Sequence, residues 1–196
     1  MARPCPSWQM NHFHKAARSW QDRFAPRELV AIGIFAAAAK TATLVIALAG
    51  GGMNPLTLML KNAVYTTLVV VMLCKVRKGG TLVLFTAANL LVSLLLLGGS
   101  VTLIPTAFAA AAAAELAMAA LGGVRSTKAL FIGVALNDLL SKALSLGVSL
   151  LYLRESPALA WVAVPIVAIG YAGCICGLFS GARLSKELRH AGILRS

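Results

Sequence analysis

The sequence predicts an all-α membrane protein with six transmembrane helices in one bundle and both chain termini on the cytoplasmic side (N-in/C-in). Three observations support this fold class. First, 59% of the residues are hydrophobic and only 12% are charged, whereas soluble domains are roughly 45–50% apolar and about 25% charged. Second, the apolar residues form six runs of about 20 residues, which is the length that crosses a bilayer. Third, most of the basic residues lie between these runs.

The six expected spans are separated by turns rich in glycine or charge. We expect them at residues 28–49, 56–74, 81–97, 101–121, 129–153 and 158–182. The chain then divides into a basic, amphipathic cytoplasmic segment (1–27), a six-helix transmembrane domain (28–182) and a basic cytoplasmic tail (183–196). The N-terminal segment fits two alternatives, a helix lying along the inner membrane surface or a partly disordered basic tail.

The orientation follows from the distribution of Lys and Arg. Of the 18 residues of these two types, fourteen lie in the N-terminal segment, the second and fourth connections and the tail, whereas the opposite side carries Arg154 alone. Cytoplasmic loops are enriched in positive charge, so both termini are expected inside. The same distribution accounts for a net charge of +12 without nucleic acid, because the chain offers no basic surface interleaved with aromatic residues.

Five ionisable residues lie within the apolar spans. Such groups are costly in a membrane, usually face the protein interior, and often mark a binding site or pathway. With a rise of about 1.5 Å per residue, Lys40, Lys61 and Lys142 fall in the outer and middle depths of the membrane. Glu115 and Asp138 fall in its inner third.

Two interpretations of these residues remain open. In the functional one, the three lysines line an outward-facing substrate cavity, together with the polar and aromatic residues Asn54, Tyr65, Asn89, Asn137 and Trp161. In the structural one, Asp138 and Lys142 pair within one helix because they are four residues apart, and Lys40 pairs with Glu115 across helices. Lys61 has no acid at its depth and is the strongest ligand candidate. Desolvated lysines favour a carboxylate, a phosphate or another electron-rich group.

The first span carries small residues at four-residue spacing, Gly33, Ala37 and Thr41. Such a face allows another helix to approach closely in lipid, but the spacing does not say whether that helix belongs to the same chain. No spacing of His, Cys, Asp and Glu matches a standard metal site, so we expect no bound metal.

Four stretches of this chain resemble one family of transport proteins. They are residues 27–37 (RELVAIGIFAA), residues 74–81 (CKVRKGGT), Ala114-Glu115-Leu116 followed by residues 122–128 (GGVRSTK), and residues 184–193 (LSKELRHAGI). They resemble the substrate-binding (S) components of energy-coupling factor (ECF) transporters, specifically the MptD-type (Trep–Strep) family. The resemblance extends from about Arg27 to Ile193.

The resemblance implies a component of an ABC importer in the bacterial cytoplasmic (inner) membrane. An S component binds a micronutrient in its outer half, and a transmembrane coupling subunit with two ATP-binding subunits drives its release. Gly33, Ala37 and Thr41 would form the face on which the coupling subunit docks. The chain would then be no enzyme and hold no cofactor, with ATP used by its partners. Consistent with this, it contains no Gly-x-x-x-x-Gly-Lys-[Ser/Thr] phosphate loop.

Two other classes of function remain as alternatives. A small ion- or proton-coupled carrier could use Asp138 or Glu115, although the sequence shows no internal repeat. An intramembrane enzyme is less favoured. The stretch of residues 177–181 has one residue too many for the Gly-x-Ser-Gly motif of an intramembrane serine protease, and no histidine lies in any span.

Overall fold

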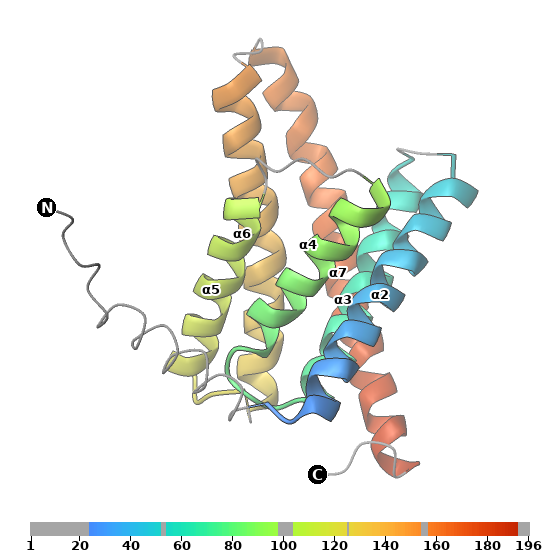
Figure 1. Ribbon diagram of the computed structural model, residues 1–196. Helices are drawn as coiled ribbons and strands as arrows, with labels where there is room; N and C mark the ends of the chain where they lie inside the picture. The colour runs from blue at the N-terminus through green and yellow to red at the C-terminus, as the bar shows by residue number, and fades with distance from the viewer. Residues whose placement is uncertain (1–23, 52–53, 98–103, 125, 154–156, 192–196) are drawn as a thin grey trace, which may run out of the picture. The chain divides into compact units, whose positions relative to one another are not determined.

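The computed structural model is all-helical and describes residues 24–51, 54–97, 104–124, 126–153 and 157–191. Among these residues there is no strand. The helices are α2 (Pro26–Ala49), α3 (Pro55–Lys75), α4 (Thr81–Leu97), α5 (Ile104–Ala120), α6 (Thr127–Leu153) and α7 (Pro157–His190) (Figure 1). The predicted all-helical fold is confirmed, and each expected span corresponds to one helix.

Four helical stretches are long and apolar enough to cross a membrane: Pro26–Ala49, Pro55–Lys75, Thr127–Val148 and Pro165–His190. The other two helices, α4 and α5, are apolar but have only 17 residues each. At about 1.5 Å per residue, each is roughly 25 Å long, a little shorter than the ~30 Å hydrocarbon core of a typical bilayer. The composition and length of the helices thus indicate a membrane-embedded protein with four candidate spans.

The two ends of the described chain are helical beyond the predicted spans. α2 begins at Pro26, whose fixed φ suits the first helical turn, and the Ala25 backbone N–H donates to the Glu28 carboxylate at 2.9 Å. α7 continues through the predicted tail to His190. Arg189 and His190 in its last turn favour this extension, because cations stabilise the negative end of a helix.

The chain separates within α2 into two compact units, the first ending at Ala31 and the second beginning at Ile32. In the second unit, the most extensive helix pair is α3 with α7. A Cβ atom on Gly173 would lie 2.3 Å from the Met59 carbonyl oxygen, and one on Gly177 would lie 2.5 Å from the Ala63 carbonyl oxygen. Only glycine permits this approach between two backbones.

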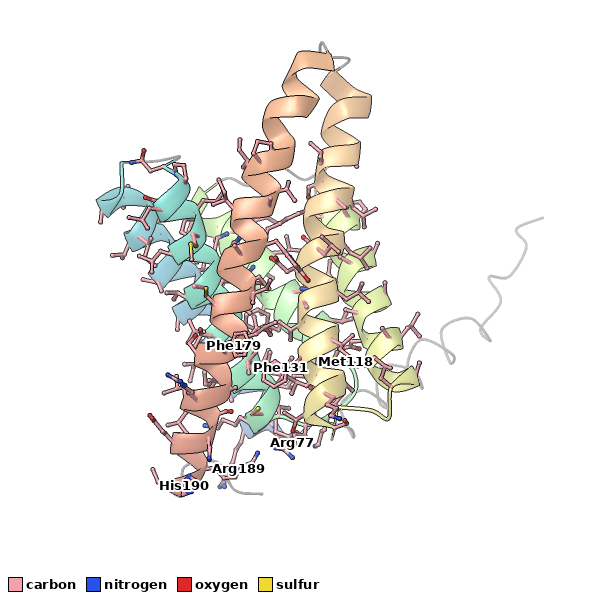
Figure 2. All side chains as sticks on the ribbon, turned by 180° about the vertical axis from the view of Figure 1, so that it is seen from behind. Arg77, Met118, Phe131, Phe179, Arg189 and His190 are labelled. Atoms are coloured by element: carbon pink, nitrogen blue, oxygen red, sulfur yellow. The ribbon has the colours of Figure 1, made fainter. Side chains whose placement is uncertain are left out.

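α5 and α6 form the second extensive pair. Met118 of α5 packs directly on Gly133 of α6, where a Cβ atom would lie 2.2 Å from the methionine Cγ. Figure 2 labels Met118 at this helix pair.

The buried core lies at one end of these helices. It gathers the last turns of α3, the first turns of α4, the second half of α5 and the first turns of α6, represented by Met72, Leu82, Phe85, Met118 and Leu130. Towards the opposite end the packing opens, and Leu95 near the end of α4 is 78% exposed. The second unit therefore has a closed end, where the core lies, and an open end.

Glu115 of α5 completes the closed end. Its carboxylate accepts hydrogen bonds from the backbone N–H groups of Gly80 (2.9 Å), Leu82 (2.7 Å) and Val83 (3.1 Å) at the start of α4. These N–H groups have no acceptor within their own helix, and the helix start favours a negative charge. The alternative in which Glu115 pairs with Lys40 is therefore wrong, because its oxygens are occupied by the helix start.

Candidate ligand-binding cavity

A cavity of about 380 Å³ opens between α2, α3 and α6, away from the closed end. This volume lies in the usual range for small-molecule sites, about 300–1,000 Å³. The lining residues are Lys40, Thr43, Leu44 and Ala47 from α2, Lys61, Asn62 and Tyr65 from α3, and Asp138, Ser141 and Lys142 from α6. Three ammonium groups thus share the cavity wall with one carboxylate.

The charges in this cavity are not balanced. Lys142 and Asp138, one turn apart on α6, form an ion pair, as the structural interpretation predicted. Lys40 and Lys61 form no ion pair within the described part of the chain, and they lie close enough to repel each other. Both are half-buried. Partly desolvated cations without a counter-charge favour an anionic ligand between them.

Contacts from outside the cavity hold several lining residues in place. The Asn62 side-chain amide donates to the Gly170 carbonyl oxygen of α7 at 2.8 Å. A Cβ atom on Gly170 would lie 3.3 Å from the Lys142 ammonium nitrogen, so α7 passes close behind Lys142. The Tyr65 ring packs against Phe85 of the core, with ring centroids 5.9 Å apart. These contacts orient the polar wall before any ligand binds.

The structure brings together four of the predicted site residues, Lys40, Lys61, Tyr65 and Lys142. The sequence-based set did not include Asn62, Thr43, Asp138 or Ser141 as ligand candidates. The lining residues of α2 could have been predicted from the sequence, because residues 40, 43, 44 and 47 have the spacing of a single helix face.

Three other predicted residues, Asn54, Asn89 and Asn137, do not line the cavity. Asn54 is exposed, and its side-chain amide donates to the Gly50 carbonyl oxygen at 2.9 Å, which stabilises the turn between α2 and α3. Asn137 and Asn89 lie half-buried on α6 and α4, and the Asn89 amide oxygen has no partner among the described residues. The side chain of Trp161 lies outside the described residues.

The predicted docking residues lie on the exposed side of α2. Gly33, Ala37 and Thr41 are exposed, whereas Ile32, Ala36 and Ala39 of the same helix are buried. A Cβ atom on Gly33 would meet no other atom within 4 Å. The small-residue face thus has no helix packed at Gly33 within the described chain, and its role in docking stays a prediction.

No family model, no curated protein and no solved structure matches this chain.

Proposed function

We propose that this protein is the substrate-binding component of an ECF-type ABC importer, which binds a small anionic or electron-rich micronutrient in the cavity of Lys40, Lys61 and Lys142. The observation that supports this best is the cavity itself. Its polar wall comes from three helices and carries two half-buried lysines with no acidic partner in the described chain. A chain that presents such a wall at its open end is suited to capture a ligand there.

The proposed topology has all six helices crossing the membrane, with both termini in the cytoplasm. The short helices α4 and α5 have 17 residues, which is the lower end of the range for a membrane span. The basic residues Lys75, Arg77, Lys78 and Lys128 lie at the closed end, so the rule for cytoplasmic loops puts that end inside. The open end and its cavity then face outward.

The proposed partners are a transmembrane coupling subunit and two ATP-binding subunits. The exposed face of Gly33, Ala37 and Thr41 supports this, because small residues let a partner helix approach the backbone. No residue of this chain would take part in ATP hydrolysis. Energy from the partners would instead drive release of the ligand to the cytoplasm.

The test of the cavity is the substitution Lys61→Gln, with Lys75→Gln as the control, because Lys75 is an exposed lysine of the same helix outside the cavity. Mass spectrometry of the purified protein first identifies the bound small molecule, and titration then measures its affinity. We expect a carboxylate or phosphate compound. Loss of a charge-assisted hydrogen bond, about 1.5–3 kcal/mol, should weaken its binding by roughly ten- to hundredfold.

The control should bind with unchanged affinity. A bound cation, an uncharged hydrocarbon, or a Lys61→Gln variant with the affinity of the natural chain would contradict the anionic-ligand proposal.

Asp138 supports one rival, a proton-coupled carrier, because this carboxylate is partly buried in the cavity beside Lys142. Purification of the tagged protein from its native membrane separates the two functions. An S component should copurify with two ATPases and a coupling subunit. A carrier should purify without them and lose proton-driven uptake on Asp138→Asn.

A further inference from the structure

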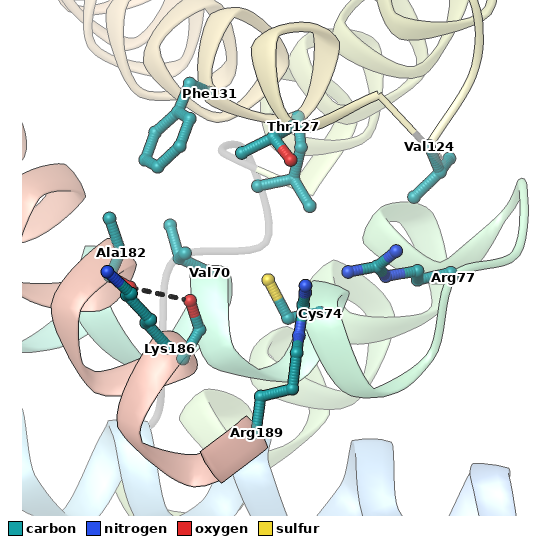
Figure 3. Close-up of a pocket in the computed structure, with 11 residues that line it drawn as sticks. Val70, Cys74, Arg77, Val124, Thr127, Phe131, Ala182, Lys186 and Arg189 are labelled. Carbon is teal, nitrogen blue, oxygen red and sulfur yellow. Dashed lines mark hydrogen bonds between the residues drawn. The ribbon is translucent and has the colours of Figure 1, made fainter. Parts of the chain in front are cut away.

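A second pocket, of about 170 Å³, lies at the closed end between α3, α6 and α7. Three basic side chains line it: Arg77 just after α3, and Lys186 and Arg189 near the end of α7. The hydroxyl groups of Thr127 and Ser185 also line it, and its apolar wall includes Phe131. In Figure 3 the guanidinium groups of Arg77 and Arg189 point toward one another beside Cys74.

The pocket is strongly cationic. Among the described residues no acidic side chain lines it, and none of its three basic side chains forms an ion pair with another described residue. Thr127 is the first residue of α6, so the positive end of that helix borders the same space. The guanidinium groups of Arg77 and Arg189, with Thr127 and Lys186 at the border, therefore line a volume large enough for a phosphate group. The Ser185 hydroxyl donates to the Ala182 carbonyl oxygen at 2.9 Å instead.

An apolar surface continues from the pocket along α7. Phe179 is 71% exposed and precedes Lys186 by seven residues, so both lie on the same side of the helix. In Figure 2, Phe179 and Phe131 lie farther from the closed end than Arg77 and Arg189 do. A ligand with a phosphate head and a hydrocarbon tail would match this succession of basic and then apolar surface.

We infer that this pocket binds the phosphate group of an anionic phospholipid of the inner leaflet. Guanidinium groups form paired hydrogen bonds with phosphate oxygens, and basic pockets between membrane helices are suited to anionic head groups. An acyl chain extends from the phosphate along α7 over Phe179. The single negative charge of the bound phosphate offsets part of the positive charge of Arg77, Lys186 and Arg189, and the lipid joins the ends of α3, α6 and α7.

The lipid pocket is separate from the cavity of the lysines. Thr127 and Lys142 lie fifteen residues apart on α6, roughly 22 Å along the helix. Substitutions in the pocket can therefore be tested without altering the proposed substrate site. The assignment to the inner leaflet rests on the proposed topology, which has the closed end in the cytoplasm, whereas binding of the phosphate group does not depend on the proposed substrate.

The test compares the double variant Arg77→Gln/Arg189→Gln with the control Lys75→Gln/Arg183→Gln. The control removes two positive charges from the same regions without touching the pocket. Native mass spectrometry of the full chain in detergent measures binding of phosphatidylglycerol, phosphatidylcholine and inorganic phosphate. We expect the natural chain to prefer phosphatidylglycerol, the pocket variant to lose about tenfold in affinity for it, and the control to stay within about twofold.

The variant Phe179→Ser separates a lipid from free phosphate. It should weaken phosphatidylglycerol binding and leave any binding of inorganic phosphate unchanged. Binding of inorganic phosphate that phosphatidylglycerol does not displace would overturn the lipid assignment in favour of a free phosphate. If the pocket and control variants lost phosphatidylglycerol affinity equally, or if neither lost affinity, the proposed site would be overturned. If the double variant does not fold, the single variant Lys186→Gln takes its place, and the same loss of phosphatidylglycerol affinity is expected.

Discussion

Two helices of this protein carry small residues at four-residue spacing, and the structure uses them differently. On α7, Gly173, Gly177 and Gly181 are buried against α3. On α2, Gly33 and Ala37 are exposed. The same spacing therefore marks a contact already made within the chain in one helix, and an open surface in the other.

The difference between the two helices lies in what stands opposite each stripe. The α7 stripe faces α3, where the hydroxyl groups of Thr67 and Ser180 share a 2.5 Å hydrogen bond. The Thr67 hydroxyl also lies 2.7 Å from the Ala63 carbonyl oxygen of its own helix. At Gly33 on α2, the surroundings are empty to 4 Å. In lipid, where the hydrophobic effect does not drive helices together, close packing and hydrogen bonds decide which helices associate. The stripe on α2 makes no such contact at Gly33 within the described chain, which is why we propose it as the docking face.

The largest expected effect comes from adding one methyl group to each stripe. Gly177→Ala puts a Cβ atom 2.5 Å from the Ala63 carbonyl oxygen, and because a backbone cannot move aside as a side chain can, it should destabilise the protein by roughly 1–3 kcal/mol. Gly33→Ala should leave stability unchanged or raise it slightly, since alanine is the better helix former. Unfolding of the purified variants in denaturing detergent measures both. Equal stabilities would show that the α3–α7 contact is looser than the structure indicates.

A bulky residue on the exposed stripe should have its effect on assembly. Ala37→Leu should abolish the complex with the proposed coupling subunit, because the larger side chain prevents close approach of a partner helix. Stability and ligand affinity of the isolated chain should be unchanged, because Ala37 is exposed and lies outside the cavity. Copurification and ligand titration on the same preparation give both readings. Loss of ligand binding with an intact complex would mean that the docking face lies elsewhere.

The smallest expected effect concerns hydroxyl groups at matched positions. Thr67→Val removes the hydrogen bond that Thr67 of α3 shares with Ser180 of α7, and interhelical bonds of this kind in membranes average about 0.6 kcal/mol. Thr41→Val on the exposed stripe should change stability by less than this. The comparison requires repeated unfolding curves in one detergent. If Thr41→Val lowered stability more than Thr67→Val does, the roles assigned to the two stripes would be reversed.

Much of the candidate cavity was predictable because charge inside an apolar run is visible without a structure. Lys40, Lys61 and Lys142 stand out for that reason, and the periodicity of α3 put Tyr65 on the same face as Lys61. Asn54 and Asn89 were included because they are polar residues that can form hydrogen bonds. Polarity does not distinguish a side chain that faces the cavity from one that bonds to a turn, as Asn54 does.

The sequence by itself determined the class of the protein, the six helices and most of their boundaries, because these follow from local runs of apolar residues and from the turns between them. Only the tertiary structure decided which residues contact one another. It assigned Glu115 to the start of α4 rather than to Lys40, and it joined Asn62 to Gly170, 108 residues away. It also paired the glycines of α7 with α3. Such contacts depend on how helices that are distant in the sequence pack against one another. The local sequence does not specify that packing.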